Sequence, residues 1–222
     1  CIRDRLSFGV LAAFVLIGYF GMWADTMRTL AIITVATLLS ISIGVPIGIA
    51  MARSDRVQTI VTPILDIMQT MPAFVYLIPV VMLLGIGKVP GILAVLVYAI
   101  PPVIRLTNLG IRLVDKDVLE AAIAFGATRR QRLLEVQLPL ALPTIMAGIN
   151  QTIMMALAMV VIASMIGVKG LGQPVLKAIT NQYFTMGLLN GLAIVVIAIV
   201  FDRVSQAYAK RSQKHLEGLH GA

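Results

Sequence analysis

The sequence predicts an all-α integral membrane protein with about six transmembrane helices, organised as one membrane domain over residues 1–222. Three observations predict this class. Hydrophobic residues make up 59% of the chain, charged residues 13%, and the mean hydropathy is +0.96, outside the range of soluble globular domains. Several stretches are apolar for about 20 residues, the length that crosses a bilayer as a helix. One polar, basic stretch, Glu120–Pro139, interrupts this pattern.

The predicted spans, in chain order, cover residues 6–23, 29–52, 57–85, 89–109, 140–166 and 186–208. The first ends in Tyr19, Phe20 and Trp23, aromatic side chains that suit the membrane interface. We therefore expect lipid to surround the domain.

Glycine and proline distinguish the next three spans. In the second, Gly44 and Gly48 with Pro46 between them permit either close contact with another helix or a kink. The third is too long for one straight crossing, and three prolines can bend it: Pro63, Pro72 and Pro79. The fourth is interrupted by Pro101 and Pro102.

The positions of Lys and Arg predict the orientation, because cytoplasmic loops carry an excess of these residues. With the N-terminus in the cytoplasm, only four of the 18 fall outside: Arg28, Lys88, Lys169 and Lys177. This arrangement puts both termini and Glu120–Pro139 in the cytoplasm. We attribute the net charge of +8 to membrane orientation and expect no nucleic-acid partner, since no basic stripe is interleaved with aromatic residues.

The polar stretch predicts a helix, a sharp break, a second helix and then a new long segment. Asp117 with Glu120, and Thr128 with Gln131, have the three-residue spacing of N-caps with reciprocating side chains. Gly126 suits the break because it adopts left-handed backbone angles without a Cβ penalty. Pro139 suits the first turn of the segment that follows. The predicted cytoplasmic segment covers residues 115–138.

These residues also carry a family resemblance. Glu120-Ala121-Ala122, then Gly126, then Val136-Gln137-Leu138-Pro139 resembles the EAA motif of the membrane subunits of binding-protein-dependent ABC importers, with Val136 where that motif usually has Ile. The resemblance implies a type I importer (MetI-like) membrane domain whose cytoplasmic loop docks on an ATPase subunit. The residues expected to couple the two are Glu120, Ala121, Ala122, Gly126, Ala127, Arg129, Arg130, Leu138 and Pro139.

Longer runs narrow the resemblance. Met68–Pro79, Val136–Gln151, and Val160–Ile166 followed by Gly170–Gln173 are similar to the permease subunits of glycine betaine/proline betaine/choline importers. The likeness covers about residues 23–208. It implies a bacterial inner-membrane protein that works with a second permease copy or a related permease subunit. It also implies two cytoplasmic ATPase subunits that hold ATP and Mg²⁺, and an external solute-binding protein.

The chain carries no pattern for catalysis, so we expect a transport subunit and not an enzyme. Gly85-Ile86-Gly87-Lys88 lacks the spacing and the Ser/Thr of a Walker A motif. Neither Gly-x-Ser-x-Gly nor His-Glu-x-x-His occurs, and the two histidines, His215 and His220, lie in the polar tail. The single cysteine, Cys1, excludes an internal disulfide and a multi-thiolate metal site. We expect this chain to bind no cofactor or metal.

Uncharged polar and thioether side chains within the spans are the candidates for a solute path: Gln69, Thr70, Met71, Asn150, Gln151, Met154 and Met155. The alternative for each polar residue is an interhelical hydrogen bond, which contributes about 0.6–2 kcal/mol in a membrane. Asp66 and Arg105 fall near predicted cytoplasmic ends, where an interfacial ion pair or a snorkelling side chain is expected.

Three alternatives to a betaine importer remain open: an importer of another small solute such as an amino acid or methylamine, an autonomous secondary carrier, and a membrane scaffold or sensor. Sparse membrane charges count against the carrier. The five Tyr and one Trp form no clear cage for a quaternary ammonium group. Between Gly167 and Met186 we expect a loop and a short helix at the outer mouth, which contacts the binding protein, closes the gate or only connects two spans.

Overall fold

The computed structural model describes residues 2–217, and side chains from 9 to 207 with residue 13 excepted. Cys1 and His220 therefore lie outside the described residues. Within the described part, the chain is helical throughout with short connections and contains no strand. The all-α class is confirmed.

The helices follow one another with few long connections. In chain order they are α1 (Ile2–Tyr19), α2 (Trp23–Arg53), α3 (Asp55–Thr70), the 3₁₀ helix η1 (Ala73–Tyr76), α4 (Leu77–Leu84), α5 (Lys88–Ala99), α6 (Pro101–Arg112), α7 (Lys116–Ala124), α8 (Arg129–Gln131), the π-helix η2 (Arg132–Gln137), α9 (Leu138–Ala163), the 3₁₀ helix η3 (Ser164–Ile166), α10 (Gly172–Asn181) and α11 (Phe184–Glu217).

Four stretches of the described chain are long and apolar enough to cross a membrane: Trp23–Arg53, Lys88–Arg112, Arg129–Ile166 and Phe184–Ala207. The bent pair Asp55–Thr70 and Ala73–Leu84 is a fifth candidate. α1 contains a shorter apolar helix, Gly9–Tyr19. These segments overlap the six predicted stretches in the sequence, although α2 begins six residues before the predicted start at 29 and α1 ends before Phe20.

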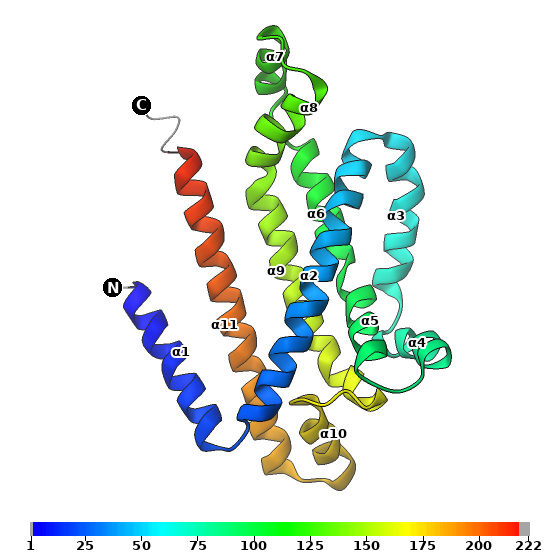
Figure 1. The fold of residues 1–222 in the computed structure, drawn as a ribbon, viewed down its shortest axis with the longest axis vertical. Coiled ribbons are helices and arrows are strands. Elements are labelled where there is room, and N and C mark those ends of the chain that lie inside the picture. The colour runs from blue at the N-terminus through cyan, green and yellow to red at the C-terminus, as the bar shows by residue number, and fades with distance from the viewer. Residues whose placement is uncertain (1, 218–222) are drawn as a thin grey trace.

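The centre of the molecule is formed by α2, α6 and α9 (Figure 1). Glycines let α2 and α6 approach closely. A Cβ built on Gly44 would lie 2.5 Å from Val103 Cγ1, and one on Gly48 would lie 2.8 Å from the Ile104 carbonyl oxygen. The glycine pair therefore serves close helix contact, and α2 continues as one helix through Pro46.

One of the three prolines in the third predicted span breaks the helix. Met71 is extended (φ −69°, ψ 133°), as expected for the residue before Pro72, whose ring disfavours helical angles at its predecessor. The direction of the chain bends by 111° between the two halves of the span. Pro63 remains inside α3. At the next span, Pro101 and Pro102 occupy the first turn of α6, and residues 88–112 still count as one apolar stretch.

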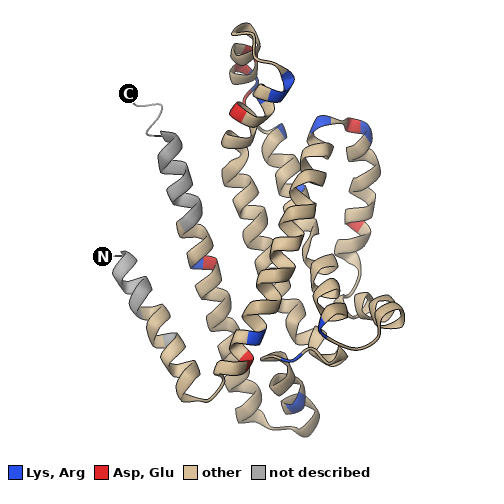
Figure 2. Ribbon diagram, viewed as in Figure 1, with Lys and Arg blue, Asp and Glu red and all other residues tan. Residues whose placement is uncertain are grey.

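The two ends of the molecule differ in charge. α7 and α8 project from one end and α10 closes the other (Figure 1). Lys and Arg gather at the end that carries α7 and α8, and fewer lie near α10 (Figure 2). The aromatic residues Tyr19 and Trp23 are exposed on either side of the turn from α1 to α2. This turn lies toward the α10 end (Figure 1), where the two side chains can meet lipid headgroups.

Candidate functional site: the coupling segment and the central helices

Residues 115–139, named here the coupling segment, begin with an aspartate cap. The side chain of Asp115 accepts a hydrogen bond from the Asp117 N–H at 3.0 Å, so Asp115 is the N-cap of α7. The prediction that Asp117 caps this helix was wrong. Both aspartates have the right chemistry, and the chain turns two residues earlier than the Asp117–Glu120 spacing indicated.

Gly126 ends α7 as predicted. Its φ is +81°, a left-handed angle that glycine adopts at little cost. The Ala127 N–H donates to the Ala122 carbonyl at 3.0 Å, and the Gly126 N–H donates to the Ile123 carbonyl at 2.9 Å. This pair of bonds is the Schellman arrangement, which satisfies the last carbonyls of a helix. The reversal of the chain is therefore fixed by backbone bonds.

The second half of the coupling segment begins with the predicted capping box. The Gln131 N–H donates to Thr128 Oγ1 at 3.3 Å, and the Thr128 N–H donates to Gln131 Oε1 at 3.0 Å. Beyond it, α9 begins at Leu138 with Pro139 in its first turn, as predicted. The break expected before this segment is absent, because α8, η2 and α9 follow one another directly and residues 129–166 form one continuous helical stretch. The π turn η2 precedes Pro139, and its wider spacing relieves the clash that a proline ring makes with the carbonyl four residues earlier.

The tip of the coupling segment presents side chains outward. No residue of α7 is buried, and Glu120, Arg129 and Arg130 are exposed. Phe125 is 92% exposed, the one large aromatic on this surface. Phe125 was not among the predicted site residues, although its place directly before Gly126 was a signal, because the C-cap residue of a helix at a sharp reversal projects its side chain.

The base of the coupling segment is packed on the membrane helices. Leu133 is buried in a cluster with Ile111 of α6 and with Ala141 and Ile145 of α9. Leu138 packs at the edge of the same cluster. The segment is thus rigidly attached to α9 by helix continuity and to α6 by apolar packing, so a displacement of its tip reaches both helices.

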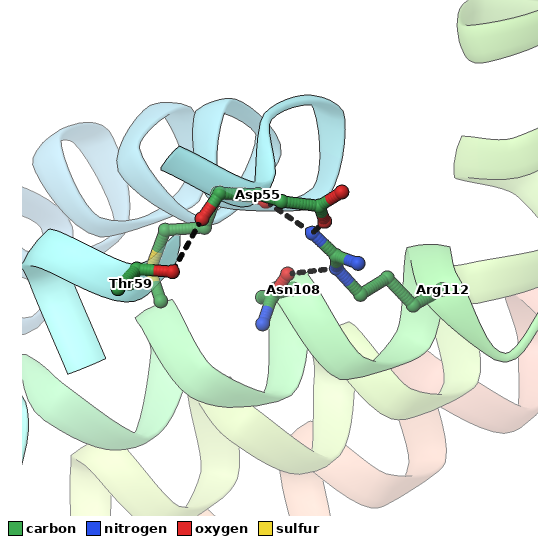
Figure 3. A network of polar contacts seen from close by, with 5 residues as sticks. Asp55, Thr59, Asn108 and Arg112 are labelled. Atoms are coloured by element: carbon green, nitrogen blue, oxygen red, sulfur yellow. Dashed lines mark hydrogen bonds and ion pairs between the residues drawn. The ribbon is translucent and has the colours of Figure 1, made fainter. Parts of the chain in front are cut away.

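A polar network ties the α2–α3 turn to α6 near the same end (Figure 3). Arg112 Nη2 lies 2.7 Å from Asp55 Oδ1 and donates to the Met51 carbonyl at 2.9 Å, while its Nε donates to Asn108 Oδ1 at 3.1 Å. One guanidinium therefore links three helices. Because Asp55 is exposed, the ion pair itself contributes little, and the bond to the Met51 carbonyl holds the end of α2 against α6.

Asp66 and Arg105 form an ion pair between α3 and α6. Of the two alternatives expected for these residues, an ion pair or a snorkelling side chain, the structure shows the ion pair. The pair lies about two helical turns from the end of α6, deeper than the predicted cytoplasmic ends, and it links the last turns of α3 to α6.

The predicted path residues fall into two groups that the structure does not join by a hydrogen bond among the described residues. Gln69 and Thr70 are exposed at the end of α3, where Thr70 Oγ1 donates to the Asp66 carbonyl at 3.0 Å. Met71 packs against the central core. These three residues sit at the bend between α3 and α4.

The predicted path residues of α9 face different surroundings. Asn150 Nδ2 donates to Asp202 Oδ1 of α11 at 2.6 Å, and its Oδ1 accepts from Ser205 Oγ at 2.8 Å. Gln206 Nε2 donates to both oxygens of Asp202 at 2.8 and 2.9 Å. Asn150 therefore makes the interhelical hydrogen bonds that were the alternative to a path role. Sequence reasoning missed Asp202, whose carboxylate in an apolar span was the available signal.

Gln151 and Met154 point away from the rest of the chain. They belong to an exposed stripe on α9 whose members recur every three or four residues: Ala147, Gln151, Met154 and Ala158. Met155, one position on, packs against the core. A stripe of this spacing is one face of a helix, and only a surface outside this chain can cover it.

At the opposite end, the predicted loop and short helix are present as residues 167–171 and α10. Thr29 Oγ1 of α2 accepts from the Leu171 N–H at 2.9 Å, which ties the loop to the core. An open apolar hollow of about 430 Å³ lies between α10 and α11, lined in part by Ile179, Tyr183 and Phe184.

The fold and the coupling segment define a class of protein. The family model described as binding-protein-dependent transport system inner membrane component matches residues 44–214, and the chain belongs to this family. The match includes the coupling segment and every long helix except α1 and the first part of α2.

Curated relatives are permeases of betaine transport systems. The glycine betaine/proline betaine transport system permease protein ProW of Escherichia coli (strain K12) is 52% identical over 208 residues, covering 94% of this chain and 59% of the relative. The glycine betaine transport system permease protein OpuAB of Bacillus subtilis (strain 168) is 53% identical over 196 residues, covering 88% of this chain and 70% of the relative. The chain thus spans about three fifths of the length of ProW.

A solved structure agrees with the fold. The MetNI methionine ABC transporter in inward facing conformations matches with a TM-score of 0.76 at 21% identity, covering 84% of this chain and 93% of that one. The predicted MetI-like type I importer fold is confirmed.

Proposed function

We infer that this chain is the permease subunit of an ATP-driven importer for glycine betaine and related quaternary amines. The identity of 52–53% to betaine permeases over most of the chain supports the solute class. The chain moves the solute inward and has no catalytic activity of its own, since hydrolysis takes place on separate ATPase subunits. ATP and Mg²⁺ bind to those subunits.

The observation that carries this proposal is the continuous helical stretch of residues 129–166. It joins the exposed tip of the coupling segment to the central helix α9 without a flexible joint. A docked ATPase that closes on nucleotide would displace the tip, and the rigid connection to α9 and α6 would convert this displacement into an outward-facing to inward-facing change.

The exposed stripe on α9 supports a second permease copy as partner. In a pair of copies, the exposed stripes of the two α9 helices border one solute path. Gln151 and Met154 line this path together with Gln69, Thr70 and Met71. Asn150 acts by holding α11 against α9. An amide and soft thioethers let a small zwitterion pass without holding it tightly, so selectivity resides mainly in an external solute-binding protein.

The proposal also specifies the membrane, the orientation and the partners of the chain. It resides in a bacterial inner membrane with the coupling segment and both termini in the cytoplasm, where the clustered cations of Figure 2 agree with the positive-inside rule. Two ATPase subunits dock on the coupling segments of the two copies. The α10 end faces the binding protein.

Reconstitution tests the proposal. The full protein is placed in liposomes with its ATPase and binding protein, and uptake of labelled glycine betaine is measured with and without ATP. We expect uptake only when all components and ATP are present. Uptake without the ATPase would instead establish an autonomous carrier, and the absence of uptake for every betaine tried would refute the solute class.

Two variants test the coupling segment in the same system. Gly126→Pro removes the N–H that donates to Ile123 and imposes a negative φ, and Glu120→Arg reverses a charge on the exposed face. We expect both to lose ATPase docking and uptake while the permease remains in the membrane. Lys177→Glu, a charge reversal on α10 at the other end, is the matched control for docking. Normal uptake in both coupling variants would refute the assigned role.

A further inference from the structure

A cleft of about 350 Å³ lies at the base of the coupling segment. Its walls come from the end of α2, the end of α6 and the start of the 129–166 helix, and the lining residues are Ala52, Arg53, Ile111, Arg129, Arg132, Leu133 and Gln137. We name it the arginine cleft. Its volume is within the range of about 300–1,000 Å³ that small-molecule sites occupy.

The floor of the cleft is rigid. Ile111 is 2% exposed and Leu133 is 7% exposed, and both belong to the buried cluster that joins α6 to α9. Ala52 packs against the same cluster. The cleft is therefore preformed between packed helices, so a ligand would not have to order the walls.

The charge of the cleft is unbalanced. None of its lining residues is acidic, and among the described side chains no carboxylate forms an ion pair with Arg53, Arg129 or Arg132. By contrast, Arg28, Arg105 and Arg112 each pair with an aspartate. Three guanidinium groups around one cleft repel one another, and a bound anion offsets that repulsion.

The backbone adds to this preference. Arg129 occupies the first turn of a helix that starts at Thr128, where the helix dipole favours negative charge and opposes a cation. Arg53 stands in the last turn of α2, where the dipole favours its cation. An anion in the cleft would offset the unfavourable placement of the Arg129 cation and pair with the Arg53 cation.

The position of the cleft indicates the source of the anion. Ala52 and Ile111 are among the last residues of two apolar stretches, Trp23–Arg53 and Lys88–Arg112, so the cleft opens where the helices leave the hydrocarbon. Headgroups lie at this depth, and basic pockets between transmembrane helices bind anionic headgroups. Guanidinium groups bind phosphate through paired N–H donors.

We propose that the arginine cleft binds the phosphate group of an anionic phospholipid. The bound headgroup neutralises the cleft and joins the coupling segment to the ends of α2 and α6. The lipid is thus a structural ligand at the point where the coupling segment meets the membrane helices.

Native mass spectrometry of the purified full-length protein tests the site. The probes are phosphatidylglycerol and phosphatidylcholine with the same acyl chains. We expect the protein to retain phosphatidylglycerol at least tenfold more tightly, and Arg53→Gln, Arg129→Gln and Arg132→Gln each to weaken retention by about tenfold, the effect of one lost charge-assisted contact. Arg56→Gln, an exposed arginine of the same end that does not line the cleft, is the matched control and should change nothing.

Further arms separate the alternatives. Arg→Lys changes at the same positions keep the charge without the planar fork and should give intermediate losses, and they replace any Gln variant that fails to elute as a folded, helical protein. Equal retention of both lipids, or equal loss in Arg56→Gln, would overturn the proposal. Binding of inorganic phosphate without any preference for phosphatidylglycerol would also overturn it. The same holds if the Gln variants weaken ATPase docking but leave lipid retention unchanged. The measurement needs neither ATP nor solute, so its failure leaves the proposed import function intact.

Discussion

Asn150 and Gln151 are neighbours on α9 with different surroundings. Asn150 holds the carboxylate of Asp202 and the hydroxyl of Ser205 on α11, whereas Gln151 belongs to the exposed stripe. Two residues that the sequence groups as one path therefore do different work. Gln151, the polar side chain of the exposed stripe, is the better path candidate.

Leucine substitutions separate these roles. We expect Asn150→Leu to lower the thermal stability of the detergent-purified protein, because it removes two interhelical hydrogen bonds of about 0.6–2 kcal/mol each. It also leaves Asp202 with Gln206 as its remaining donor. Gln151→Leu should leave stability unchanged and reduce uptake in reconstituted vesicles. Equal melting temperatures for both variants would contradict the role given to Asn150, and normal uptake in Gln151→Leu would contradict that given to Gln151.

Phe125 is the residue at which a partner is most directly tested. An aromatic side chain that is 92% exposed at the tip of a fixed turn stabilises nothing within this chain, and such side chains anchor interfaces when a pocket receives them. We expect Phe125→Ala to leave the melting temperature unchanged and to weaken ATPase binding by about tenfold or more, measured by co-purification and titration. Phe184→Ala, which removes an exposed phenyl ring at the opposite end, should bind the ATPase normally.

Among the elements, the contact of α2 with α6 is the most restrictive. A Cβ on Gly48 would lie 2.6 Å from Thr107 Cβ and 2.8 Å from the Ile104 carbonyl oxygen, and neither can yield without moving the backbone of α6. We expect Gly48→Ala to destabilise the protein by about 1–3 kcal/mol through overpacking. Thermal unfolding in detergent measures this.

Gly191→Ala is the matched control on α11, because a Cβ there meets no atom within 4 Å. Its melting temperature should equal or exceed that of the unchanged protein, since alanine favours the helix. A similar loss of stability in both variants would show that helix propensity and not close packing governs the Gly48 position.

Local chemistry is what the sequence predicted well. The bonds between Thr128 and Gln131 span three residues, and the left-handed Gly126 depends on its own backbone, so spacing alone located both. Hydropathy located the long apolar helices, since a segment in hydrocarbon must satisfy its backbone hydrogen bonds by itself and therefore forms a helix. The continuity of residues 129–166 was missed because a proline pattern predicts a helix start without revealing that a π turn can join it to the preceding helix.

Contacts between distant residues were beyond the sequence. Asn150 and Asp202 lie 52 positions apart, and no pattern in one sequence shows which faces of α9 and α11 meet. The same holds for the arginine cleft, where Arg53 and Arg132 come from helices that only packing brings together. From the sequence, the two glycines of α2 allowed either a close helix contact or a kink. The position of α6 in the structure shows that they serve close contact.

At the scale of the whole molecule, the two charged ends predict opposite sides of the membrane. The described residues place the coupling segment at the end where Lys and Arg gather and α10 at the other (Figure 2), and the positive-inside rule assigns the first to the cytoplasm. A Cys1→Ser background allows single cysteines to be labelled in spheroplasts by a membrane-impermeant maleimide. We expect Lys177→Cys to react in intact spheroplasts and Arg130→Cys to react only after permeabilisation. Ile199→Cys, exposed on the apolar part of α11, should resist the reagent in intact and in permeabilised spheroplasts because lipid covers it. The reverse labelling pattern at positions 130 and 177 would invert the orientation, and with it the side on which an ATPase can dock.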